Sequence, residues 1–86
     1  MNRDEVLAIV TGHMAEAVEG LSPSAIDPAL SMKDHGLDSL DIVEVVSRSM
    51  RALKVKVPRS GLRGLTTIDG FVDVLHGLVS AREDQA

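Results

Sequence analysis

The sequence contains no cysteine, tryptophan or tyrosine, and Phe71 is its single aromatic residue. Without cysteine the chain can form neither a disulfide framework nor a Cys-ligated zinc or iron-sulfur site, so the fold depends on packing. One aromatic ring is too few for the stacking platforms that bind single-stranded nucleic acid. No apolar run approaches the roughly 20 residues that span a bilayer, so we expect no stable membrane insertion. The first ten residues lack the features of a signal peptide, which predicts a cytoplasmic protein.

What the chain does contain is typical of a small globular protein. Its 86 residues are 44% hydrophobic and 26% charged, which is too apolar for a disordered segment. A chain of this length supports one hydrophobic core. We therefore expect a single domain, residues 1–86, that is a monomer.

The net charge of −4 is unevenly distributed along the chain. Residues 1–47 carry nine acidic and two basic side chains, whereas residues 48–63 carry six basic side chains and no acidic one. Such an asymmetry bears on the choice of partner more than on the fold.

The first 20 residues predict an amphipathic helix. Asn2, followed three residues later by Glu5, forms an approximate capping-box pattern, because asparagine is a good N-cap although the motif itself uses Ser or Thr. Gly20 with Pro23 is expected to end the helix. Its apolar stripe comprises Leu7, Val10, Met14, Ala17, Val18 and Leu21.

Residues 21–38 predict an unusually long loop, because two prolines and Gly36 exclude a long regular element. A loop of this length inside a small domain needs apolar anchors or a function. We interpret it as a packed, candidate functional loop anchored by Ile26, Leu30, Met32 and Leu37.

A second helix is expected over residues 39–53, with Asp38 at its N-cap. Glu44 and Arg48 have the favourable i,i+4 order on its outer face, together with Asp41 and Arg51. Its inner stripe is predicted to be Leu40, Val43, Val46, Met50 and Leu53.

The remaining residues predict a connector and two more helices. Lysine and valine alternate over residues 54–57, which predicts a short extended segment ending at Pro58. Residues 59–65 permit at most one helical turn. Thr66 or Thr67 caps the last helix, which frays from Ser80. Its core face is Ile68, Phe71, Val72, Leu75, Leu78 and Val79. The fold class is therefore all-α, with three longer helices, one short third helix and a long first loop.

The most informative stretch is GLDSLDIVE, residues 36–44. It places the Ser39 hydroxyl at the amino end of a helix, where unpaired N–H groups and the helix dipole favour an anion by about 0.3–1 kcal/mol. Ser39 is therefore well placed to carry a phosphoester. No GxSxG elbow and no evident His/Asp pair accompany it, so the sequence does not predict a catalytic nucleophile.

With these residues the chain resembles acyl carrier proteins. Asp38-Ser39-Leu40 matches the DSL attachment motif of that family, and the match D-S-L-D-x-V-E-x-V extends to Val46. The similarity covers nearly the whole chain, including the long loop, the connector ending in proline, the short third helix and the Thr-Thr pair. It implies a four-helix carrier-protein bundle. It also implies that a phosphopantetheinyl transferase attaches 4'-phosphopantetheine from coenzyme A to Ser39, whose terminal thiol then carries an acyl group as a thioester.

The resemblance also implies how the site is surrounded. Asp38, Asp41 and Glu44 match acidic positions that face the transferase and the acyl-loading and acyl-processing enzymes. Leu40 and Val43 are expected to pack beneath and beside the attachment point. The transferase reaction needs magnesium, for which this chain supplies at most Asp38 or a neighbouring carboxylate.

The basic residues depart from fatty-acid carriers, which are usually acidic in this part of the chain. They are Arg48, Arg51, Lys54, Lys56, Arg59 and Arg63. This surface favours a specialised carrier for a polyketide, aminoacyl, siderophore or other dedicated acyl pathway, with Arg48, Arg51 and Arg59 as candidate partner contacts.

Other interpretations of these residues remain open. Ser39 is also suited to an N-cap or first-turn position, and Asp41 and Glu44 to a solvated helix face. The arginines are suited to the C-terminal end of a helix. Nucleic-acid binding by the basic residues would need aromatic residues and a recognition helix, which the sequence lacks. The histidines, His13, His35 and His76, lack the spacing of a metal site, and the sequence assigns His35 no role. Core packing explains the methionines Met14, Met32 and Met50, although a deformable gap between carrier helices can also admit an acyl chain.

The sequence therefore predicts a free-standing carrier protein rather than an enzyme. The alternative is a helical protein-interaction module that carries no prosthetic group.

Overall fold

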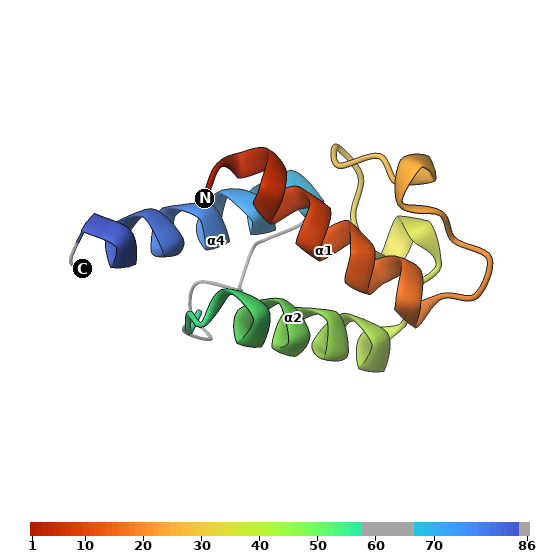
Figure 1. Cartoon of the computed structure of the whole chain (residues 1–86). Coiled ribbons are helices and arrows are strands. Elements are labelled where there is room, and N and C mark those ends of the chain that lie inside the picture. The colour runs from red at the N-terminus through yellow and green to blue at the C-terminus, as the bar shows by residue number, and fades with distance from the viewer. Residues whose placement is uncertain (58–66, 85–86) are drawn as a thin grey trace.

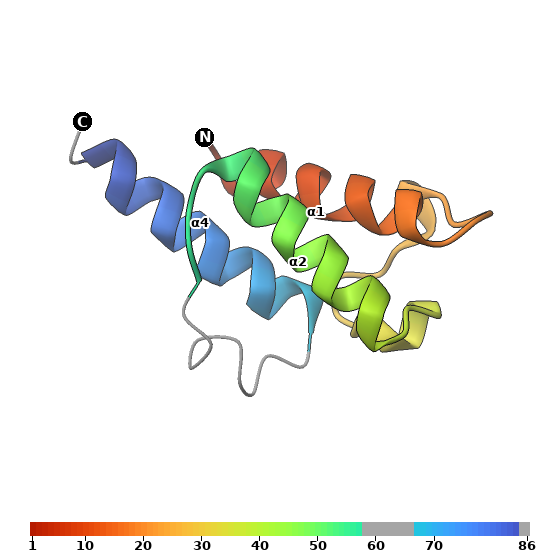
Figure 2. The same ribbon diagram turned by 90° about the horizontal axis from the view of Figure 1, so that it is seen from below.

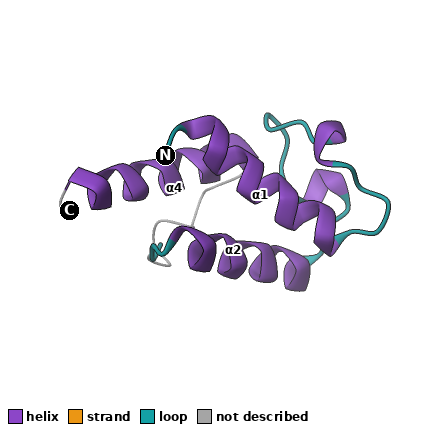
Figure 3. Cartoon of the chain, viewed as in Figure 1, coloured by secondary structure: helices purple, strands orange, loops and turns teal. Residues whose placement is uncertain are grey.

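The computed structural model describes residues 1–57 and 67–84. Across those two ranges it contains the α-helices α1 (Arg3–Ala17), α2 (Ser39–Leu53) and α4 (Ile68–Asp84), two 3-10 turns and no strand (Figure 3). The turns are η1 (Pro23–Ala25) and η2 (Lys33–His35), both in the long loop. The all-helical fold class is confirmed for this part of the chain, whereas the predicted short helix at residues 59–65 lies outside the described residues.

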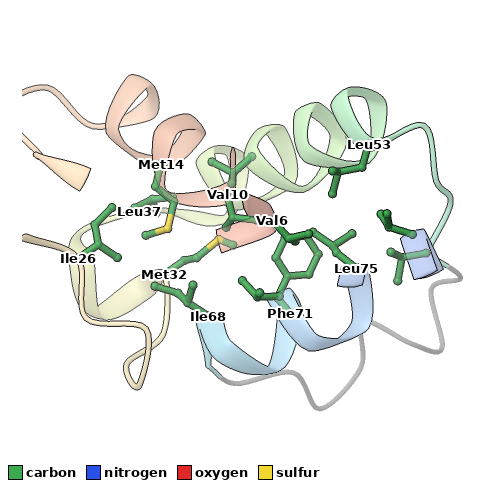
Figure 4. Packing of buried hydrophobic residues seen from close by; sticks show 14 residues of the cluster. Val6, Val10, Met14, Ile26, Met32, Leu37, Leu53, Ile68, Phe71 and Leu75 are labelled. Carbon is green, nitrogen blue, oxygen red and sulfur yellow. The ribbon is translucent and has the colours of Figure 1, made fainter. Parts of the chain in front are cut away.

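Helix α1 packs against both α2 and α4, and the long loop returns from its C-terminal end to the start of α2 (Figure 1, Figure 2). The enclosed core contains side chains from all three helices and from the loop, as Figure 4 shows. Its members are Val6, Val10, Met14, Ile26, Met32, Leu37, Val45, Leu53, Val57, Ile68, Phe71, Val72, Leu75 and Val79. None of the helices among the described residues is long and apolar enough to cross a membrane.

Helix α1 begins as predicted and ends earlier. Asn2 is its N-cap, and it forms a capping box in which its side chain accepts from the Glu5 amide at 2.8 Å. Val18 already adopts an extended conformation, so the helix ends at Ala17 rather than at Gly20. The buried face is centred on Val6, whereas Leu7 of the predicted stripe is only partly buried.

Helix α2 has the predicted bounds, but its buried face is different. Leu40 is 80% exposed and Val43 is 62% exposed, so their assignment to the inner stripe is wrong. The buried row consists of Val45, Ser49 and Leu53, which follow one another at i,i+4 spacing. The predicted stripe counted apolar residues alone and so passed over Ser49, which is completely buried.

Helix α4 confirms the predicted cap and core face. The Thr67 hydroxyl accepts a hydrogen bond from the Gly70 amide at 3.1 Å, and Leu78 is the one residue of the predicted face that is only partly buried. The prediction that the helix frays from Ser80 is wrong, because helical structure continues to Asp84. The Arg82 guanidinium donates from Nη1 to the carbonyl oxygens of Leu53 at 2.9 Å and Lys54 at 3.0 Å, which fixes the end of α4 against the end of α2.

Candidate functional site

Ser39 is the first residue of α2, and Asp38 rather than Ser39 caps the helix. The Asp38 carboxylate accepts from the Asp41 amide at 2.8 Å, and the Asp41 carboxylate accepts from the Asp38 amide at 3.3 Å. Ser39 is therefore a first-turn residue whose hydroxyl is not needed for capping. Its side chain is exposed and forms no hydrogen bond to a described residue.

The amide groups beside this hydroxyl are also open. The first amides of a helix have no partner within the helix, and those of Ser39 and Leu40 donate to no other described residue. In α4 the equivalent groups are occupied, because the Ile68 amide donates to the Leu30 carbonyl at 3.0 Å and the Asp69 amide to the Pro28 carbonyl at 2.9 Å. The start of α2 thus combines a free hydroxyl with unpaired N–H groups and the positive end of a helix dipole, which together suit a phosphate ester.

The long loop that delivers Ser39 is packed, as predicted. Ile26, Met32 and Leu37 are buried, whereas Leu30 is 44% exposed, so its assignment as an apolar anchor is wrong. Leu30 contributes its main-chain carbonyl to the start of α4 instead of its side chain.

The last turn of the loop is fixed by local hydrogen bonds. The Ser31 amide donates to the Asp34 carboxylate at 3.0 Å, and the Asp34 amide donates to the Ser31 hydroxyl at 3.1 Å. Hydrogen bonding with Ser31, chiefly from its amide and also with its side chain, holds the pKa of Asp34 below its ordinary value. Gly36 then turns the chain with φ 92°, a left-handed conformation that glycine adopts at little cost, and Leu37 returns to the core.

The exposed face of α2 carries apolar and charged side chains next to Ser39. Leu40 and Val43 project into solvent, so the expectation that they pack beneath and beside the attachment point is wrong. Glu44 pairs with Arg48 at 2.6 Å, which confirms the predicted i,i+4 contact. Asp41 is half-buried at the N-terminal turn, where it closes the capping box.

The basic residues occupy different environments. Arg48 also contacts Glu16 of α1 at 3.3 Å, so two carboxylates surround its charge. The contact with Glu16 could not be predicted from the sequence, because the two residues are 32 positions apart. Arg51 is exposed in the last turn of α2, and Arg59 lies outside the described residues.

A groove of about 1300 Å³ runs along the flank of α2. Met32, Met50 and Phe71 are among its apolar lining residues, in line with the predicted role of methionine at a deformable gap between helices. Met14, by contrast, is completely buried in the core. The other lining residues are Ser31, Lys33, Asp34, Ile42, Val43, Val46, Ser47, Lys56, Val57 and Thr67.

The histidines are distributed over the fold. His13 lies 3.6 Å from Glu16 on α1, whereas His35 is half-buried in the loop. Over residues 1–57 and 67–84, no three His, Asp or Glu side chains are grouped so that they could hold a metal ion.

Comparison with known proteins gives concordant results. Residues 13–75 match the family model described as phosphopantetheine attachment site. The polyketide biosynthesis acyl-carrier-protein AcpK of Bacillus subtilis (strain 168) is 24% identical over 81 residues, which cover 94% of this chain and 99% of that protein. The meromycolate extension acyl carrier protein of Mycobacterium leprae (strain TN) is 30% identical over 87 residues, covering 100% of this chain and 75% of that protein.

One solved structure is similar to the whole fold. It is a chain in the crystal structure of the curacin biosynthetic pathway HMG synthase in complex with acetyl donor-ACP. The TM-score is 0.79 and the sequence identity 28%, with 90% of this chain and 99% of that chain covered.

Proposed function

The chain belongs to the acyl carrier protein family, whose members carry covalently attached 4'-phosphopantetheine, and from this premise we propose that Ser39 is the attachment residue. The prosthetic group supplies the thiol that this cysteine-free chain lacks and holds the acyl intermediate as a thioester. The observation that carries the proposal is the exposed Ser39 hydroxyl at the first position of α2, beside amides with no partner among the described residues.

The loading step requires only a nucleophilic oxygen from this chain. Ser39 Oγ forms a bond to the phosphorus of the pantetheine phosphate, and the bond from that phosphorus to the adenosine bisphosphate of coenzyme A breaks. The Ser39 hydroxyl has no hydrogen bond to a carboxylate or imidazole of a described residue, so a base of the transferase takes the hydroxyl proton. Asp38 keeps the helix start in place through its capping box, and the amides of Ser39 and Leu40 are free to bind the ester phosphate.

We further propose that Leu40, Val43 and Glu44 form the contact surface for the transferase and the acyl-processing enzymes. Two exposed apolar side chains next to a charged one supply both the buried centre and the charged rim of a transient interface. Asp41, Arg48 and Arg51 extend this surface, and Arg48 is paired there with Glu16 and Glu44.

The pathway we propose is a specialised acyl pathway. Similar proteins are named for polyketide biosynthesis and for meromycolate extension, and the basic residues over 48–63 depart from the usual acidic surface of fatty-acid carriers. The groove along α2 has room for an acyl chain.

Intact-mass measurement tests the attachment. The apo-protein is incubated with coenzyme A and a broad-specificity phosphopantetheinyl transferase, and we expect one added phosphopantetheine. Ser39→Ala should gain none, whereas Ser47→Ala, which removes an exposed hydroxyl two turns further along the same helix, should load like the wild type. A folded wild-type protein that gains no mass, or a Ser39→Ala variant that does, would favour the interaction module without a prosthetic group.

A further inference from the structure

His35 forms a hydrogen bond with each nitrogen of its ring. Nε2 accepts from the Asp27 amide at 3.0 Å, and Nδ1 lies 2.9 Å from the Ser31 carbonyl oxygen. Both partners are main-chain groups, so a donor faces Nε2 and an acceptor faces Nδ1. The geometry therefore requires a neutral imidazole with its proton on Nδ1.

The ring joins two parts of the long loop that have different tasks. The part from Asp27 to Ser31 rests on α4, because the carbonyls of Pro28 and Leu30 accept from its first two amides. Residues 36–38 connect His35 to Ser39, with Gly36 in a left-handed conformation and Leu37 buried in the core. His35 thus sets the position of residues 36–38, which precede Ser39, relative to α4.

Protonation of the ring would place an N–H group opposite the Asp27 N–H group, and that hydrogen bond would be lost. The charged side chains from Asp27 to the end of the loop are Asp27, Lys33, Asp34 and Asp38. At the start of α4, Asp69 is already paired with Arg3 of α1 at 2.9 Å. A positive ring would be attracted to these carboxylates. That attraction does not remove the conflict between the two donors at Asp27.

We propose that neutral His35 is a positioning residue that holds the loop in the geometry for loading of Ser39, and that its protonation slows loading. This inference rests on the proposed attachment at Ser39. Nothing in the loading chemistry requires His35 to touch the transferred phosphate.

The test compares variants across the range in which imidazoles titrate. His35→Gln retains an acceptor and a donor side by side on one carboxamide and cannot be protonated, whereas His35→Leu retains bulk and loses both bonds. All three proteins are loaded by the same transferase, so the ratio of wild type to His35→Gln cancels the pH response of the transferase. We expect a ratio of kcat/KM near one while the ring is neutral, which falls by up to about fivefold where the ring is protonated, the factor for one lost hydrogen bond. His35→Leu should load more slowly than His35→Gln at every pH, with no pH dependence in that ratio.

A wild-type to His35→Gln ratio that stays constant with pH overturns the proposal. NMR of the wild-type protein supplies an independent measurement, because nitrogen chemical shifts distinguish the two tautomers. We expect the Nδ1–H form at about pH 8, and amide signals of Asp27 and Ser39 that move together as the ring titrates. An Nε2–H tautomer, or a Ser39 amide that does not move, also overturns it. If no variant is loaded at any pH, the attachment at Ser39 fails, and the NMR result alone decides the role of His35.

Discussion

Two leucines of α2 offer a direct test of which face of this helix is buried. Leu40 is 80% exposed and lies next to Ser39, whereas Leu53 is 4% exposed and closes the buried row at the other end. Leu40→Ala and Leu53→Ala remove the same atoms from the same helix. We expect the first to affect partner recognition and the second to affect stability.

The expected magnitudes follow from these exposures. A leucine that is already in solvent loses almost no buried area, so Leu40→Ala should change the free energy of unfolding by less than about 0.5 kcal/mol. Truncation of a buried leucine removes transfer free energy and leaves a cavity, which costs about 3 kcal/mol. In a domain of this size, about 4–8 °C of Tm corresponds to 1 kcal/mol, so Leu53→Ala should lower Tm by roughly 12–24 °C.

Thermal unfolding followed by circular dichroism measures both variants, and loading of Ser39 at a temperature where both are folded measures recognition. We expect Leu40→Ala to raise KM for the transferase while Tm stays unchanged, because its side chain would be buried only in the complex. A fall of more than about 5 °C for Leu40→Ala would refute the orientation of α2, since an exposed leucine cannot cost that much.

Two further changes test contacts that fix the helices. Ser49→Ala should raise the free energy of unfolding by about 1 kcal/mol relative to Ser47→Ala, because Ser49 Oγ is buried without a hydrogen-bond partner among the described residues and Ser47 is exposed. Urea unfolding measures the difference, and a Ser49→Ala protein less stable than Ser47→Ala would contradict the burial of an unpaired hydroxyl. Arg82→Met should lower the free energy of unfolding by about 1 kcal/mol more than Arg51→Met, because it removes two hydrogen bonds to the end of α2, whereas Arg51→Met removes an exposed guanidinium from the last turn of α2. Equal losses of stability in the two variants would show that the hydrogen bonds of Arg82 contribute nothing.

The parts of the fold that the sequence predicted correctly are specified by neighbouring residues. Asn2, Asp38 and Thr67 each cap the helix that follows them, and each cap depends on groups within three residues. The bounds of α2 could therefore be predicted to the residue. The packed nature of the loop was also predictable, because so long a segment must bury apolar side chains such as Met32 and Leu37.

What the sequence could not predict depends on residues far apart in the chain. The predicted stripe of α2, which includes Val43, and the observed buried row, which includes Ser49, lie close together on the helix. The positions of α1 and α4 determine which of the two is buried. The carbonyls of the loop bond to the start of α4 through main-chain groups, which carry no sequence signal. The same applies to His35, whose partners are an amide and a carbonyl of the backbone.

The contacts between the loop and α4 also bear on the selectivity of modification. A transferase that recognises a serine or threonine hydroxyl at a helix start meets two such residues among the described helices, Ser39 of α2 and Thr67 of α4. At α4 the Thr67 hydroxyl and the first two amides are already engaged. The loop carbonyls therefore occupy the first amides of α4, whereas those of Ser39 and Leu40 have no partner among the described residues, so that only Ser39 would offer the transferase a hydroxyl beside unpaired N–H groups.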